Sequence, residues 1–194
     1  MPSRVNYLKI YLPALLTGLV LLSACENDLN KVRAIAAADA TKPIQKTTGV
    51  EVTYSDSAIV KGVLTAPLLF EYQTKKNPYK ITPNGVKILF YEADGTQDGQ
   101  LTADTALIYD EKQLIVFRKN VVGVKKDGTT YKSEELLWDQ KTKEIYSNKP
   151  VLMTKPNGDQ TTGTSFRTDD KFKNPIFQNS TAILHVEGDG LSQQ

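Results

Sequence analysis

From residue 50 onward, apolar and polar residues follow the short alternation that is typical of β-strands. The clearest apolar runs are residues 86–91 and 114–117, and both are rich in β-branched and aromatic side chains. No stretch after residue 50 repeats its apolar positions at the spacing of an amphipathic helix. The pattern therefore predicts an all-β fold.

Turn signals separate these apolar runs. Asparagine or aspartate followed by glycine tolerates the positive φ angles that tight turns require. Such dipeptides occur at Asn84-Gly85, Asp94-Gly95, Asp98-Gly99, Asp127-Gly128 and Asn157-Gly158. We therefore expect antiparallel hairpins with turns at these positions.

An internal repeat of about 30 residues runs through the same region. Gly99, Gly128 and Gly158 are spaced by 29 and 30 residues. After each glycine come an apolar residue, an Asp-x-Lys triplet, an isoleucine and an asparagine: Leu107, Asp110, Lys112, Ile115 and Asn120, then Leu136, Asp139, Lys141, Ile145 and Asn148, then Phe166, Asp169, Lys171, Ile176 and Asn179. We interpret each copy as turn, strand, turn, strand. The aspartate is expected to accept a hydrogen bond from the backbone N–H two residues later, and stacked copies share one core.

Alternation within the copies predicts an interior set of side chains. In the first copy, Leu101, Ala103, Leu107 and Tyr109 are expected on one face, opposite Thr102. Across the domain the interior set is Leu107, Tyr109, Ile115, Phe117, Leu136, Trp138, Ile145, Val151 and Met153. Interior apolar residues are ordinarily plain core, but in a fold with a groove the same residues contact the ligand.

The apolar run at residues 181–186 is a candidate docking edge. It contains no lysine or proline, the residues that commonly protect an exposed strand from pairing with another chain. Thr181, Ile183 and His185 would then pair with a partner by strand addition. The alternative is that this strand pairs within the domain.

The first 25 residues follow a different pattern. Arg4 and Lys9 precede an apolar run at 10–22, and Ser23-Ala24-Cys25 follows it. This is the layout of a secretory signal, and its end resembles the lipobox of bacterial lipoproteins, which implies lipidation of Cys25. As an uncleaved helix, residues 10–24 would rise only about 22 Å, short of the ~30 Å membrane core. We expect a signal peptide at 1–24, a lipidated N-terminus and tether at 25–49, and a folded domain at 50–190.

Composition narrows the function. Without residues 1–24 the chain has 22 basic and 22 acidic residues, so its formal net charge falls from +2 to 0, which argues against nucleic acid as a partner. Cys25 and His185 are the sole cysteine and histidine, so the usual metal-ligand spacings are absent and no nucleophile motif accompanies His185. Glu134 and Glu135 are adjacent and point to opposite faces of a strand, so they cannot act as a carboxylate pair. We expect no cofactor, no metal and no catalysis.

The repeat resembles a known family. Residues 101–106, Tyr109-Asp110, Asn120-Val121, 136–139 and 142–148 are similar to the OstA-like repeat, and the single anchor, short tether and one domain are similar to the LptC family, the periplasmic component of the lipopolysaccharide export ABC transporter. The resemblance implies an antiparallel, V-shaped β-jellyroll, open along one side, whose apolar interior holds the acyl chains. It also implies three partners: lipopolysaccharide, the permease subunits of the inner-membrane ABC transporter, and a periplasmic bridge protein of the same repeat family.

The resemblance departs from the family at the N-terminus, where many members have a transmembrane helix and this chain has a lipobox. We therefore expect a lipoprotein that faces the periplasm, with the inner membrane favoured and the outer membrane as the alternative. A different class of function is also open: a lipid-anchored scaffold or adhesin would have the same anchor and repeats, but a filled core.

Overall fold

The computed structural model describes residues 42–74 and 77–185, which form β-strands joined by turns. The expected signal peptide, Cys25 and most of the tether lie outside the described residues. The strands are β1 (Gln45–Asp56), β2 (Ile59–Tyr72), β3 (Tyr79–Thr82), β4 (Val86–Tyr91), β5 (Gln97–Ala103), β6 (Thr105–Tyr109), β7 (Leu114–Lys125), β8 (Thr130–Asp139), β9 (Glu144–Ser147), β10 (Val151–Thr154), β11 (Gln160–Gly163), β12 (Ser165–Asp169), β13 (Ile176–Gln178) and β14 (Thr181–Ile183). One 3-10 turn (Asp110–Lys112) lies between β6 and β7.

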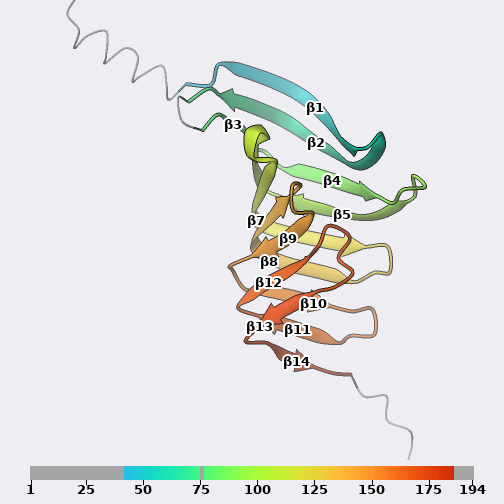
Figure 1. The fold of residues 1–194 in the computed structure, drawn as a ribbon. Helices are drawn as coiled ribbons and strands as arrows, with labels where there is room; N and C mark the ends of the chain where they lie inside the picture. Colours follow the sequence, from blue (N-terminus) through green and yellow to red (C-terminus); the bar gives the residue numbers. More distant parts are fainter. Residues whose placement is uncertain (1–41, 75–76, 186–194) are drawn as a thin grey trace, which may run out of the picture. The chain divides into compact units, whose positions relative to one another are not determined.

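Three long strands divide the sheet into two faces. The first part of β2 pairs with β4 and its last part with β3, while β7 and β8 change partners in the same way along their length. Face one therefore contains β4, β5, β10, β11 and β14, and face two contains β3, β6, β9, β12 and β13, with β2, β7 and β8 shared (Figure 1). All the pairings are antiparallel, so the expected antiparallel β-jellyroll is confirmed.

The chain passes from face to face at corners that lie along one side. In β7 the corner is at Lys119 and Asn120, whose φ angles are +63° and +49°, and the amide of Asn120 donates to the carboxylate of Asp104 at 2.7 Å. Asn179, with φ +46°, lies at the corner between β13 and β14. Asparagine tolerates this left-handed conformation better than most residues, which explains two of the three repeat asparagines.

The repeat turns lie on the opposite side. Asp139 accepts the backbone N–H of Lys141 at 2.9 Å, and Asp169 accepts that of Lys171 at 3.0 Å, as the sequence predicted. In the first copy this prediction is wrong, because Asp110 pairs with Lys80 of β3 at 2.5 Å and caps no backbone N–H two residues later.

The prediction of a turn at Asp98-Gly99 is also wrong. The hairpin between β4 and β5 turns at Asp94-Gly95 instead, where Gly95 has φ +83°, and Gly99 lies inside β5. Its lack of a side chain serves close packing, because a Cβ at Gly99 would lie 2.8 Å from the carbonyl oxygen of Val124. The sheet itself begins at Gln45, five residues before the expected domain start at residue 50.

The strands at the ends of the sheet each have one paired edge. Within the described residues, β1 pairs with β2, β13 with β12 and β14 with β11, and none of the three has a second neighbour. The N-terminal end of the sheet is thus a single strand, and the C-terminal end is one strand from each face.

Candidate functional site

The space between the two faces is filled by apolar side chains from both. Seven of the nine expected interior residues are buried there: Ile115, Phe117, Leu136, Trp138, Ile145, Val151 and Met153. They pack with residues that we had not placed in this set, including Leu64, Ile88, Phe90, Tyr131 and Phe166. The interior is one continuous apolar core that extends from β2 to β12.

Leu107 and Tyr109 are not part of this core, and their expected inward placement is wrong. Both are half-buried, whereas Ala106 and Ile108 beside them are buried in the core. The corner at Asp104, between β5 and β6, shifts the alternation by one position, so the odd-numbered residues that point inward in β5 point outward in β6.

Tyr109 instead belongs to an aromatic group outside the core. Its ring lies 6.2 Å from that of Tyr79, which stacks on Tyr72 at 4.9 Å, and the amine of Lys112 lies 5.1 Å from the centre of the Tyr109 ring. Desolvation raises the pKa of Tyr79, and the neighbouring tyrosines add to this effect.

Aromatic rings form a connected file through the core. Trp138 contacts Tyr54 and Phe90 edge to face, with centroid distances of 5.5 and 5.3 Å. The file continues from Phe90 to Phe172 at 6.4 Å, from Phe172 to Tyr131 at 4.9 Å, and through Phe166 to Phe177. These rings connect the β1 end of the interior with the β13 end, and such a file offers an apolar path along the domain.

Buried polar groups are few along this path. Burial raises the pKa of Tyr131 to about 12, with smaller contributions from Asp127 and Asp169, and burial also raises the pKa of Tyr54, so both phenols stay neutral. The indole Nε1 of Trp138 and the hydroxyl of Thr168 are buried without a hydrogen-bond partner among the described residues.

The side opposite the corners is bordered by two rows of turns, one from each face. Within the described residues no strand pairing joins these rows. Ion pairs do cross between them: Lys143 of the β8–β9 turn contacts Asp56 at 2.9 Å, and Lys171 of the β12–β13 turn contacts Glu92 of the β4–β5 turn. We call this the open side of the interior, because side chains cover it and no pairing between the described strands of the two faces closes it.

A cavity lies on the open side next to β1. Its volume is about 310 Å³, and its walls include Tyr54, Lys61, Trp138, Lys143 and Asp170. The wall is mixed: apolar rings lie beside charged groups of both signs. Burial raises the pKa of Asp170, with a further contribution from Asp169.

The expected docking residues lie at the C-terminal end of face one. Thr181 and Ile183 are exposed in β14, which pairs with β11 through one edge, so the internal pairing that we considered does form. His185 lies beyond the strand, where its backbone N–H donates to Asp159 at 2.8 Å. The other edge of β14 stays unpaired within the described residues.

The described residues contain no group of three or more acidic, histidine or cysteine side chains placed to hold a metal ion. Glu134 is exposed, and Glu135 forms an ion pair with Arg118 at 2.8 Å. In the part of the chain that the structure describes, no helix is long and apolar enough to cross a membrane.

Comparison with known proteins places this fold in a family. No curated protein matches the chain. A family profile described as lipopolysaccharide-assembly, LptC-related, matches residues 29–175, which is most of the chain and nearly all of the sheet. The chain belongs to this LptC-related family of lipopolysaccharide-assembly proteins.

Proposed function

We propose that this chain accepts lipopolysaccharide from an inner-membrane ABC transporter and passes it through the interior between its two faces to a periplasmic bridge protein. Membership of the LptC-related family supports a role in lipopolysaccharide transport. The observation that supports passage through the interior is the apolar file from Tyr54 to Phe177, which runs between faces that are joined by strand pairing on one side only. Acyl chains would lie along this file, and the polar headgroup would stay at the open side.

The two ends of the sheet support the proposed partners. A strand with one unpaired edge can accept a strand from another protein. We propose that β1 docks on the permease subunits and that β13 and β14 dock on the bridge protein, with Thr181 and Ile183 at the contact. The chain would act as a passive conduit, with ATP hydrolysis in the transporter as the energy source.

We also propose that Cys25 carries the lipid anchor and holds the domain at the periplasmic side of the inner membrane. Mass spectrometry of the purified protein tests this directly: the mature N-terminus should be an acylated Cys25, and Cys25→Ala should leave the signal peptide uncleaved. An unmodified Cys25 would remove the anchor from the proposal, and fractionation of the membranes would decide between inner and outer.

In-cell photo-crosslinking tests the conduit. A photoreactive amino acid at Phe117 or Trp138, both buried in the interior, should form an adduct with lipopolysaccharide that requires the transporter's ATP hydrolysis. The same amino acid at Lys132, which is exposed on face one, should form none. No adduct at either interior site in folded protein would rule the conduit out.

A second candidate function is a lipid-anchored scaffold or adhesin. The observation that favours it is the filled interior, since the core side chains pack against one another and the space beside Phe90, Tyr131 and Phe172 is only about 10 Å³. The same crosslinking experiment separates the two functions, because a scaffold would give protein or glycan adducts at the exposed position and none inside.

A further inference from the structure

The turn between β12 and β13 differs from the two turns that precede it on face two. In each turn one residue adopts a left-handed conformation: Gln113 with φ +52°, Lys143 with φ +58° and Phe172 with φ +53°. Gln113 and Lys143 are exposed, whereas Phe172 is 7 % exposed and belongs to the hydrophobic core. The third repeat therefore directs an aromatic ring inward from a position that is polar in the other two.

Phe172 fills the middle of the interior. Its ring lies 4.9 Å from Tyr131, 6.4 Å from Phe90 and 6.5 Å from Phe166, so it links rings of face one with a ring of face two. The tip of the ring lies over the backbone of Gly123, where a Cβ would be in ordinary van der Waals contact with it at 3.8 Å. The space left beside these rings is about 10 Å³, too little for an acyl chain.

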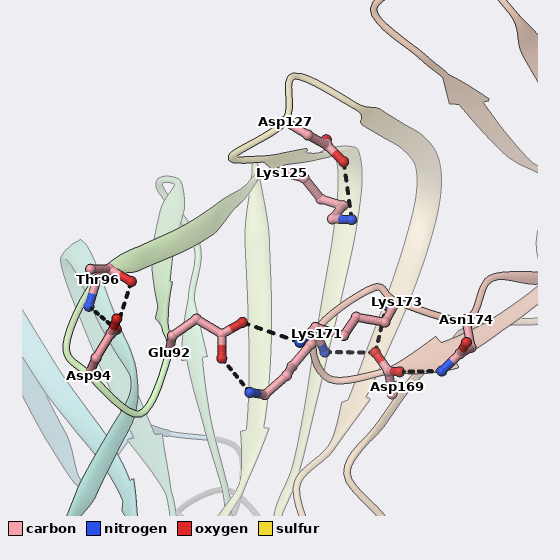
Figure 2. A network of polar contacts seen from close by, with 9 residues as sticks. All are labelled: Glu92, Asp94, Thr96, Lys125, Asp127, Asp169, Lys171, Lys173 and Asn174. Atoms are coloured by element: carbon pink, nitrogen blue, oxygen red, sulfur yellow. Dashed lines mark hydrogen bonds and ion pairs between the residues drawn. The ribbon is translucent and has the colours of Figure 1, made fainter.

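An ion pair across the open side holds the 169–174 loop, which carries Phe172, in this position. Figure 2 shows Glu92 of face one between Lys171 and Lys173 of this loop, with the Lys173 amine 3.5 Å from the second carboxylate oxygen. The Lys171 amine lowers the pKa of Glu92 and has its own pKa raised in return. Both side chains of the Glu92–Lys171 pair keep contact with solvent, at 28 % and 34 % exposure.

Asp169 keeps the loop in shape independently of this ion pair. Its carboxylate accepts the backbone N–H groups of Lys171 and Lys173 at 3.0 and 2.8 Å and the side-chain amide of Asn174 at 3.0 Å (Figure 2). The loop therefore has its own set of hydrogen bonds, none of which involves Glu92. A left-handed phenylalanine is unfavourable, so the closed position depends mainly on the packing of the Phe172 ring, and the partly exposed ion pair adds a smaller contribution.

We propose that the 169–174 loop is a plug: Phe172 occupies an acyl-chain subsite between Phe90, Tyr131 and Phe166, and an incoming lipid chain displaces it. This inference rests on the proposed conduit. The chemistry of the site fits a hydrocarbon chain, because its walls are apolar rings and the groups next to its mouth are charged. Glu92, Lys171 and Lys173 form the latch that keeps the loop closed when no lipid is bound.

Binding of cis-parinaric acid, a fatty acid that fluoresces in apolar surroundings, measures access to this subsite in the full chain. Phe172→Ala removes the plug, and Glu92→Gln releases the latch while leaving every core residue in place. If the closed loop limits access, the apparent dissociation constant should fall roughly fivefold or more for Phe172→Ala and roughly twofold to fivefold for Glu92→Gln. Tyr109→Ala and Glu135→Gln are matched controls, since they remove an aromatic ring outside the core and an ion-paired carboxylate outside the loop, and both should stay within about twofold.

The outcomes separate this inference from the proposed function. Unchanged affinity in Glu92→Gln and in folded Phe172→Ala overturns the plug, even where lipopolysaccharide crosslinks at Phe117. Equal gains in the Tyr109→Ala control also overturn it, because general loosening would then explain the binding. If Phe172→Ala does not fold, Glu92→Gln decides alone. Absence of lipopolysaccharide adducts at Phe117 and Trp138 overturns the conduit instead, whatever fatty acid binds.

Discussion

The two ends of the sheet are built differently. At the N-terminal end the 12-residue β1 pairs with β2 from Gln45 opposite Glu71 to Asp56 opposite Ile59, so one strand covers the edge of both faces. At the C-terminal end the edge is split between β13 and β14, which have three residues each. The long pairing of β1 defines its register strongly, whereas the short pairings of β13 and β14 define the register at their end less strongly.

Their exposed side chains differ as well. The exposed residues of β1 are mostly polar, as at Glu51 and Thr53. The C-terminal end exposes large apolar side chains: Ile176, Ile183 and Leu184 are 61, 65 and 68 % exposed. An apolar, unpaired edge is unusual on a protein that stays alone in solution. The comparison thus sets a long, polar end at β1 against a short-stranded, apolar end at β13 and β14, which we propose as the docking end.

The largest expected effect is the loss of packing at the β1 end. Leu64 of β2 is fully buried and lies opposite Val52 of β1 and Ile88 of β4, so Leu64→Ala should cost about 3 kcal/mol of unfolding free energy. Ile176→Ala, the control at the other end, should cost less than about 0.5 kcal/mol because the side chain is exposed. Urea unfolding followed by the fluorescence of Trp138 measures both, and equal costs would contradict the comparison.

A second change tests how tightly the short C-terminal strands are packed. A Cβ at Gly163 would lie 2.9 Å from the carbonyl oxygen of Gln178 and 2.9 Å from the Cβ of Phe177, so Gly163→Ala should push β13 away and cost about 2 kcal/mol. Hydrogen exchange should accelerate in β13 and stay unchanged in β1. Thr162→Ala, at the exposed neighbouring position, is the control and should stay within about 0.5 kcal/mol.

A positive charge introduced at the C-terminal end of the sheet should weaken docking of the bridge protein without lowering the stability of the domain. Ile183→Lys places a charge on the exposed edge of β14 and should weaken binding of the bridge protein about tenfold, since strand addition buries this residue. Co-purification from cells measures it. Thr53→Lys makes the same change in β1 and should leave the bridge protein bound; a loss of the bridge protein in both variants would mean that the ends are not distinct.

The smallest expected effect is on the segment that follows β14. The backbone N–H of His185 lowers the pKa of the Asp159 carboxyl, with further help from Asn157, so this contact is present above the ordinary pKa of an aspartate and is lost as the pH falls through the lower folded value. The amide signal of His185 should therefore shift below about pH 4, where the Asp159 carboxylate takes up a proton. In Asp159→Asn this low-pH shift should disappear, and its persistence would contradict the assignment.

Much of the fold could be predicted from local patterns. Alternation and turn dipeptides identify strands such as β4 and the turn glycines Gly95, Gly128 and Gly158, which have positive φ. The repeat aspartates predicted the hydrogen bonds of Asp139 and Asp169. These features depend on residues that are close together in the sequence, so a periodic sequence pattern can predict them.

The remaining features depend on contacts between faces. Leu107 and Tyr109 were placed inside because alternation does not reveal the shift at the Asp104 corner. Phe172 was missed for a similar reason: it lies in a polar turn, and only its neighbours in face one make it a core residue. The Glu92–Lys171 contact joins residues 79 positions apart, beyond any pattern that the repeat contains.

The strands that belong to both faces limit how the interior can widen. Because β2, β7 and β8 continue through the corners, the faces share their backbone and cannot separate as two rigid shells. If the interior is the conduit that we propose, room for a lipid would come from the open side, where a turn can move while β2, β7 and β8 stay hydrogen-bonded. The lipid would then pass along the interior through a series of small local openings, each closing before the next one forms.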